Sequence, residues 1–304
     1  QNRLRGMLES RPDWCISRQR SWGLPIPAFT DGAQTLLTAS SVRAVAKVIA
    51  EEGSDAWFKT GPDQLLRYYD KDSDIEGPKE FDWNKIEKMY DIFDVWFESG
   101  SSWNAVLKDR QGCFPADLYL EGSDQHRGWF HLSLLPSLGV HRQPPFKQLL
   151  THGFIVDKDG RKMSKSVGNT LNVQDILKQY GAEITRWWVS SLAYDTDIKV
   201  DTSFFDQAGD SYRKIRNTIR FLLSNLYDIE ITTDLTSLQQ QVSDFPKKSL
   251  PSYMMALTSQ LKESVINAYK QFNFKLAHQL IYDFCNDHCS SFYCSVAKDV
   301  LYCD

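Results

Sequence analysis

Between residues 91 and 156, short apolar runs alternate with one segment of helix length. Residues 92–97 and 116–120 are apolar runs of strand length, and each is followed by small or polar residues. Residues 130–140 read as a helix despite an internal proline, and residues 149–156 form a further strand-length run. A strand, a helix and a strand with polar residues just past the strand ends predict a parallel α/β sheet, in which ligands bind at the carboxyl ends of the strands.

The pattern after this sheet region is helical. Asn172 is a suitable N-cap for a helix that runs through Gln179 and closes at Gly181, and a second helix carries Trp187 and Trp188. From about residue 204 the pattern is helical to the end, apart from a polar loop over 228–249. We therefore expect an α/β fold, with a Rossmann-like parallel sheet half-domain over 1–203 and an α-helical bundle over 204–304.

The segment 31–90 is more polar than its surroundings, and we expect an insertion or small subdomain there. Ser41 is the expected N-cap of a helix that ends at Gly53. The segment carries no pattern of residues that indicates chemistry.

The composition limits the class of protein. Hydrophobic residues make up 42% and charged residues 24%, which is usual for a soluble globular protein. The length of 304 residues favours two domains. The formal net charge of -4 gives no sign of a nucleic-acid partner, so any such surface must be local. Six scattered cysteines without C-x-x-C pairs are typical of a reduced, intracellular protein. No apolar run approaches the length of a membrane span, and no signal peptide is visible.

A pair of lysines lies just past the predicted strand 149–156, in the segment KMSKS at residues 162–166. Lysine is a compact, strongly hydrated charge on a flexible stem, so Lys162 and Lys165 can place two ammonium groups on a polyphosphate. The alternative is a solvated loop, because a match of five residues recurs by accident.

A second polar segment, residues 121–130, follows the predicted strand 116–120. Glu121 can hold an ammonium group, and Gly122 allows a ligand to approach the backbone closely. Asp124 and Gln125 can bond ribose hydroxyls. The alternative is a helix start in which Asp124, or the serine before it, is merely the N-cap.

Trp96 lies at the end of the predicted strand 92–97, and Trp129 comes after the predicted strand 116–120. Their ring faces can form the two walls of a rigid slot for a branched aliphatic side chain. The alternative is two unrelated core tryptophans. His126 and His131 are further candidate polar ligands, with His131 expected on the surface of its helix.

These segments, taken in order, resemble the second half of the catalytic domain of the isoleucyl-tRNA synthetases, a family of class I aminoacyl-tRNA synthetases. The resemblance covers nearly the whole chain and is weakest at 31–90 and 228–250. Valyl and leucyl relatives match less well at residues 121–130. The segments that carry it are residues 11–23, 94–100, 120–130, 151–154 and 162–169, and residues 210–218 resemble the opening of the family's helical anticodon-binding domain.

The resemblance implies a role for each candidate. Glu121, Gly122, Asp124 and Gln125 would contact the isoleucyl-adenylate, and the two tryptophans would pack on the isoleucine side chain. The lysines of the 162–166 segment would bind the phosphates of ATP, which enters with Mg²⁺. The implied reaction is attack of the isoleucine carboxylate on ATP followed by transfer to tRNA(Ile), driven by positioning and electrostatics without a protein nucleophile.

A stripe of arginines on the predicted helix 211–226 is the candidate tRNA contact, consisting of Arg213, Arg216 and Arg220. They lie opposite the apolar face of the helix, where they can touch phosphates. The alternative is a solvated basic face.

Cys285, His288 and Cys289 share one side of a predicted helix, with Cys294 nearby. Such spacing can hold a metal, but the C-x-x-C pairs of zinc sites are lacking. We therefore interpret these cysteines as packed in the helical core and predict no protein-bound metal.

The family's first signature, a His-containing nucleotide motif, does not occur in the sequence, and neither does its editing insertion. We therefore expect a fragment that lacks the first half of the catalytic domain and cannot by itself activate isoleucine or edit. The rival interpretations are a valyl- or leucyl-tRNA synthetase and a non-catalytic tRNA-binding module. The predicted location is the cytoplasm, and a mitochondrial origin stays open.

Overall fold

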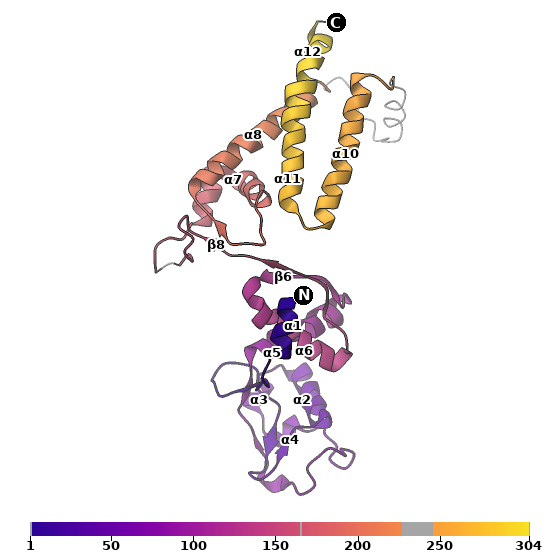
Figure 1. Cartoon of the computed structure of the whole chain (residues 1–304). Coiled ribbons are helices and arrows are strands. Elements are labelled where there is room, and N and C mark those ends of the chain that lie inside the picture. The colour runs from indigo at the N-terminus through magenta and orange to yellow at the C-terminus, as the bar shows by residue number, and fades with distance from the viewer. Residues whose placement is uncertain (1, 165, 227–245, 304) are drawn as a thin grey trace. The chain divides into compact units, whose positions relative to one another are not determined.

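The computed structural model describes residues 2–164, 166–226 and 246–303, which form two compact units divided between Thr151 and His152 (Figure 1). The elements of the first unit are α1 (Asn2–Glu9), β1 (Ser17–Arg18), β2 (Phe29–Thr30), β3 (Thr35–Leu36), α2 (Ala39–Glu52), α3 (Ala56–Lys59), α4 (Pro62–Leu65), η1 (Trp83–Lys85), β4 (Glu87–Lys88), β5 (Ile92–Phe93), α5 (Val95–Gly100), η2 (Trp103–Gln111), β6 (Ala116–Gly122), η3 (Ser123–Arg127), α6 (Trp129–His141) and β7 (Phe146–His152). The elements of the second unit are β8 (Ile155–Val156), α7 (Val173–Ser190), β9 (Ile198–Lys199), α8 (Thr202–Ser224), α10 (Leu250–Lys270), α11 (Phe274–Asp283), η4 (Phe284–Tyr293) and α12 (Cys294–Tyr302).

The polar segment 31–90 packs around a hydrophobic cluster of its own. Strands β3, β2 and β4 form an antiparallel sheet, and Trp57 is fully buried beside Phe29 at a ring-centroid distance of 5.3 Å. The prediction that Ser41 caps the helix is wrong. Thr38 is the N-cap, and its Oγ1 accepts from the Ser41 backbone N–H at 3.1 Å in a reciprocal capping box. Gly53 closes the helix as predicted.

The prediction of one strand over 92–97 is wrong in its second half. β5 ends at Phe93 and pairs antiparallel with β1, and the chain then turns into α5. The turn occurs because the Asp94 carboxylate accepts from the backbone N–H of Trp96 at 3.1 Å and so starts a helix.

The predicted strand 116–120 and helix 130–140 are confirmed as β6 and α6, and Pro136 lies inside α6. The run 149–156 is two strands rather than one. β7 ends at His152, and β8 pairs in parallel with β9 in the second unit. The predicted α/β class is confirmed, although the sheets among the described residues have two or three strands each.

The second unit is mainly helical, and the helical pattern expected from about residue 204 corresponds among the described residues to α8, α10, α11, η4 and α12. Asn172 caps α7, and Gly181 kinks it into two helical stretches at φ 82°. α10 and α11 run antiparallel, and α11, η4 and α12 follow one another without a break (Figure 1). The predicted loop 228–249 lies largely outside the described residues. No described helix is long and apolar enough to cross a membrane.

Candidate functional site

A buried carboxylate organises the start of α5. Asp94 is 7% exposed, and its Oδ2 accepts from the indole N–H of Trp14 at 3.0 Å and from the guanidinium of Arg18 at 2.6 Å. Burial alone would raise the pKa of Asp94, but the bonds from Trp14 and from the Trp96 backbone, with the charge of Arg18, lower it. Asp94 therefore stays ionised and fixes α5. This role of Asp94 is missed by sequence reasoning, although a polar residue between a strand and a helix is a signal for it.

Trp96 stands on α5 beside a cavity of about 650 Å³ in the first unit. Its side chain is 38% exposed, so a large part of the ring is free to meet a ligand. The cavity is lined by Arg18, Arg20, Ser21, Trp22, Gly23, Ile92, Phe93, Asp94, Val95, Trp96 and Glu98. The combination of aromatic walls with a few charged groups suits a small amphipathic ligand.

Trp129 begins α6 and is held on three sides. Its ring stacks on Tyr119 at 4.2 Å and 11°, and its Nε1–H donates to the carbonyl of Ser99 at 2.9 Å. Its backbone N–H donates to Oε1 of Gln125 at 2.8 Å. Trp129 is therefore a rigid residue with one defined ring orientation.

Gly128 directly precedes Trp129 and lies close to the ring of Trp96. A Cβ at this position would lie 3.3 Å from Cη2 of Trp96 and 2.4 Å from Oε1 of Gln125. The absence of a side chain allows the ring of Trp96 to approach the backbone directly before Trp129. The structure thus brings the two predicted wall residues into one neighbourhood, and their contact with an isoleucine side chain stays a prediction.

The segment after β6 leaves its acidic groups accessible. Glu121 and Asp124 are exposed, and Gly122 is buried. The alternative that a side chain caps this helix is wrong, because Gly122 is itself the N-cap of η3 and no side chain bonds there. Nε2 of Gln125 donates to Oδ2 of Asp124 at 3.2 Å, which orients that carboxylate.

The two candidate histidines of this region, His126 and His131, both have partners within the protein. His126 pairs through Nδ1 with the carbonyl of Ser123 at 2.9 Å. The expectation that His131 lies on the helix surface is wrong, since it is 4% exposed and its Nδ1 lies 3.3 Å from the guanidinium of Arg11. Burial and the nearby charge lower the pKa of His131 and favour the neutral ring.

In the second unit, a tight turn leads from β8 into the lysine segment. Oδ1 of Asp157 accepts from the backbone N–H of Arg161 at 2.8 Å, and Gly160 adopts a left-handed φ of 83°. The hydrogen bond from Asn169 and the backbone bond from Arg161 lower the pKa of Asp157. The turn brings the backbone of Lys162 against Val156 in an isolated antiparallel bridge.

Asn169 closes the lysine loop, which we define as residues 157–169. Its Oδ1 accepts from the backbone N–H of Ser164 at 2.9 Å, and its Nδ2 donates to Oδ2 of Asp157 at 2.8 Å and to the carbonyl of Lys162 at 3.3 Å. One amide side chain thus ties both ends of the loop together. This role cannot be predicted from the sequence, because nothing local to Asn169 indicates partners five to twelve residues away.

The loop is anchored on one side and open on the other. Met163 packs against the hydrophobic cluster around Trp188 and Phe205. Lys162 is exposed, and no ion pair among the described residues includes it. Its ammonium is thus available to an anionic ligand, while Lys165 lies outside the described residues.

We expect Asn169→Ala to loosen the lysine loop. Each lost hydrogen bond contributes about 1 kcal/mol, so hydrogen exchange at the Ser164 amide should accelerate by roughly tenfold or more. The measurement is amide exchange by NMR on the 304-residue chain. Thr170→Ala, an exposed neighbour, is the control. Equal exchange rates in the two variants would show that Asn169 does not close the loop.

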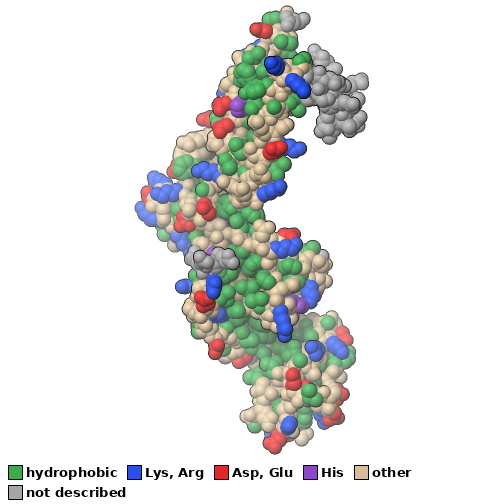
Figure 2. Space-filling view, turned by 45° about the vertical axis from the view of Figure 1, so that its right-hand side comes forward, with side chains coloured by type: hydrophobic (Ala, Val, Ile, Leu, Met, Phe, Trp, Pro, Cys, Tyr) green, Lys and Arg blue, Asp and Glu red, His purple; other side chains and the backbone are tan. Residues whose placement is uncertain are grey.

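The three arginines of α8 are all exposed, and Arg213 pairs with Asp210 on the preceding turn. On the face shown in Figure 2, blue and red side chains are interspersed. The tRNA role of Arg213, Arg216 and Arg220 therefore stays a prediction.

Two of the cysteines in the last helices are packed in the interior, while Cys285 is half-buried and Cys303 is exposed. Cys289 and Cys294 are each 6% exposed. Burial, with neighbouring Cys285 and Cys294, raises the pKa of Cys289 to about 11. Among the described residues, no group of three or more His, Cys, Asp or Glu side chains is placed to hold a metal ion.

Comparison with protein families decides the assignment. Residues 1–201 match the family "tRNA synthetases class I (I, L, M and V)". The chain belongs to this family. Residues 252–304 match a second family, "Anticodon-binding domain of tRNA ligase".

Within the family, the chain is similar to curated isoleucine–tRNA ligases. The chain is 44% identical to the isoleucine–tRNA ligase of Pelagibacter ubique, over 99% of this chain and 32% of that protein. It is 41% identical to the isoleucine–tRNA ligase of Campylobacter curvus, over 99% of this chain and 31% of the relative. The resemblance inferred from the sequence motifs is confirmed. The chain spans about a third of the length of these relatives.

Solved structures share the fold at low identity. The LeuRS of Agrobacterium radiobacter K84, in a ternary complex with tRNA and LeuAMS, aligns with a TM-score of 0.64 and 18% identity, covering 90% of this chain and 35% of LeuRS. The methionyl-tRNA synthetase of Mycobacterium tuberculosis, in complex with methionyl-adenylate, aligns with a TM-score of 0.52 and 17% identity, covering 70% of this chain and 42% of that one. Both support the fold of a class I synthetase.

Proposed function

We propose that this chain is part of an isoleucine–tRNA ligase, which joins isoleucine to tRNA(Ile) through an isoleucyl-adenylate at the expense of ATP. The observation that carries the proposal is the lysine loop. It is closed by Asn169 and anchored by Met163, in a chain 41–44% identical to isoleucine–tRNA ligases. It presents Lys162, which is exposed and forms no ion pair among the residues that the structure describes. The cytoplasmic location stays a prediction.

The first step is attack of the isoleucine carboxylate on the α-phosphorus of ATP, with pyrophosphate leaving. Negative charge grows on the leaving pyrophosphate, and the ammonium groups of Lys162 and Lys165 stabilise it. A closed loop places its charge before the reaction, so little reorganisation is needed in the transition state. Mg²⁺ enters with ATP as part of the substrate.

The first unit would hold the amino-acid part of the adenylate. Trp96 and Trp129 would contact the aliphatic side chain, and the exposed carboxylate of Glu121 would receive the isoleucine ammonium group. Gly122, Asp124 and Gln125 would line the ribose. Transfer to the terminal ribose of the tRNA follows, with the arginines of α8 as candidate phosphate contacts.

The test is amino-acid-dependent ATP–pyrophosphate exchange by the complete protein that contains this sequence. Isoleucine is expected to support the fastest exchange. Valine should be weaker, because its missing methylene removes about 0.8 kcal/mol of apolar contact. Faster exchange with valine or leucine would assign the protein to another member of the family. Binding of tRNA without exchange for any of the three would indicate a non-catalytic tRNA-binding module.

A further inference from the structure

The two tryptophans proposed as walls of the isoleucine site are held in different ways. Trp129 is fixed through its ring, which stacks on Tyr119 and donates from Nε1 to the Ser99 carbonyl. Trp96 is held through its backbone, because Oδ1 of Asp94 accepts from its N–H at 3.1 Å. The orientation of the Trp96 ring therefore depends on where the Asp94 carboxylate lies.

The position of Asp94 is set by residues far earlier in the sequence. Its Oδ2 accepts from the indole N–H of Trp14 at 3.0 Å and from the guanidinium of Arg18 at 2.6 Å. The same guanidinium donates from Nη1 to the carbonyls of Cys15 and Ser17, at 2.6 Å and 2.7 Å. These bonds hold the Arg18 guanidinium in one orientation, in which its charge compensates that of the buried carboxylate.

Trp14 is held in turn from α6. The guanidinium of Arg11 lies 5.3 Å from the centroid of the Trp14 ring, and its Nη1 lies 3.3 Å from Nδ1 of His131. His131 is buried in α6, the helix that begins at Trp129. The contacts thus run from the helix of Trp129 to the helix of Trp96. We call the four residues that make this connection the brace, which consists of Arg11, Trp14, Arg18 and Asp94.

The brace adjoins the cavity of about 650 Å³, which Arg18 and Asp94 line together with Trp96. At the far edge of the Trp96 ring, Cη2 would lie 3.3 Å from a Cβ placed on Gly128, so the backbone is close on that side. A ring that is held at its backbone and limited at its far edge is a rigid wall. Against a rigid wall, a side chain one methylene too short leaves a gap and loses contacts.

We propose that Asp94 is a positioning residue that determines specificity: with the brace, it holds Trp96 where the site fits isoleucine and leaves valine underpacked. The inference rests on the proposed function, because it takes isoleucine as the occupant of the site. Asp94 acts through Trp96 and not on the substrate. A carboxylate suits this role because its two oxygens accept on both sides, from the helix N–H and from the donors of the brace.

The first variant is Asp94→Asn, tested in the complete protein by ATP–pyrophosphate exchange with isoleucine and with valine. Asparagine keeps the shape but has one acceptor oxygen, so it cannot serve both the Trp96 N–H and the donors of the brace. The KM for isoleucine should rise about three- to tenfold with kcat nearly unchanged, because a binding contact is loosened. The KM for valine should rise less, so the preference for isoleucine falls. An unchanged KM and preference, or a loss in kcat alone, overturns the proposal.

The second variant is Trp14→Phe, which keeps an aromatic ring beneath Arg11 and loses only the indole donor to Asp94. It should change the KM for isoleucine and the preference over valine in the same direction, but less, because the bond from Arg18 remains. Urea unfolding shows whether each variant folds. If Asp94→Asn does not fold, Trp14→Phe decides, and an unchanged KM and preference in that variant overturns the proposal.

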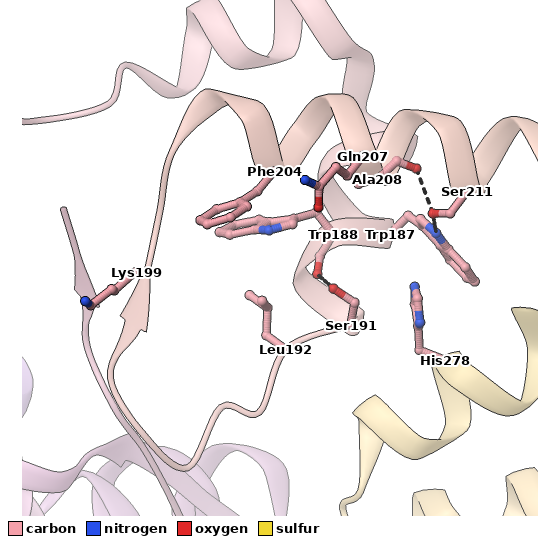
Figure 3. A pocket seen from close by; sticks show the side chains of 10 residues that line it. All are labelled: Trp187, Trp188, Ser191, Leu192, Lys199, Phe204, Gln207, Ala208, Ser211 and His278. Atoms are coloured by element: carbon pink, nitrogen blue, oxygen red, sulfur yellow. Dashed lines mark hydrogen bonds between the residues drawn. The ribbon is translucent and has the colours of Figure 1, made fainter. Parts of the chain in front are cut away.

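Ser211→Ala is the control, placed in the second unit. There the indole Nε1–H of Trp187 donates to the Ser211 hydroxyl at 2.8 Å, beside a cavity of about 350 Å³ that His278 also lines (Figure 3). The variant removes the acceptor of an indole N–H at a cavity for which no isoleucine contact is proposed. Its KM for isoleucine and its preference over valine should match those of the unmodified protein. Changes equal to those of Asp94→Asn would show that any loosened tryptophan has this effect, which also overturns the proposal.

The unmodified complete protein separates failure of this inference from failure of the proposed function. If it shows no isoleucine-dependent exchange, the ligase proposal fails, and the role of Asp94 fails with it. If it shows exchange that prefers isoleucine, and Asp94→Asn keeps both the KM and the preference, the inference alone fails. Exchange reports activation of the amino acid before any transfer to tRNA, so the comparison of isoleucine with valine concerns this site alone.

Discussion

Replacing Gly100 by alanine is expected to destabilise the first unit by about 3 kcal/mol, the upper end of the usual cost of overpacking a core. A Cβ at Gly100 would lie 2.2 Å from the carbonyl oxygen of Leu132 and 2.8 Å from its carbon. These are backbone atoms inside α6 and cannot turn aside as a side chain does. α5 would have to move away from α6, which would also strain the bond from Trp129 to the Ser99 carbonyl.

The measurement is urea unfolding of the 304-residue chain, followed by tryptophan fluorescence. Gly139→Ala in α6 is the control, because no heavy atom lies within 4 Å of a Cβ placed there. That variant should be as stable as the original or slightly more stable, since alanine favours helix over glycine by up to about 1 kcal/mol. Equal midpoints for the two variants would mean that α5 and α6 are not in the close contact described.

The elements that could be predicted from the sequence are those whose signals are local. The helix at α6, the strand at β6 and the cap of α7 by Asn172 follow from periodicity and from residues next to the element. The position of the lysine loop directly after a strand can also be predicted, because it too depends on neighbouring residues.

The run 92–97 shows why other elements could not be predicted. A run of six residues that is apolar except for Asp94 suits a strand or a short helix equally well. The choice depends on Asp94, whose partners Trp14 and Arg18 lie 80 and 76 residues earlier in the chain. No pattern within the run reveals them.

The burial of His131 has a similar origin. A helix that is apolar on most sides gives no clue to which face is covered, and the neighbour of His131 is Arg11, 120 residues away. The site shows the same limit, since the charges of the lysine loop are visible in the sequence while its closure by Asn169 depends on the folded turn.

Replacing Lys162 by alanine is expected to lower isoleucine-dependent ATP–pyrophosphate exchange by the complete protein by about 10²- to 10³-fold, the usual loss when one preorganised electrostatic contact to a transition state is removed. The loss should appear mainly in kcat, because charge builds on the leaving pyrophosphate only as the bond breaks. The KM for isoleucine should change little, since the contacts proposed for the amino acid are Trp96, Trp129 and Glu121, whereas Lys162 is proposed to bind phosphate.

Lys158→Ala is the control for this variant. Lys158 is exposed in the same turn, four residues before Lys162, and its removal changes the net charge equally. If the loop acts only through its general positive field, the two variants should lose activity to the same small extent, and more so at low salt. If Lys162 contacts the phosphates, its loss alone should be large and should persist at high salt, because a contact in a closed site is screened much less. Comparable losses in the two variants would support a solvated basic loop, the alternative that the five-residue segment by itself leaves open.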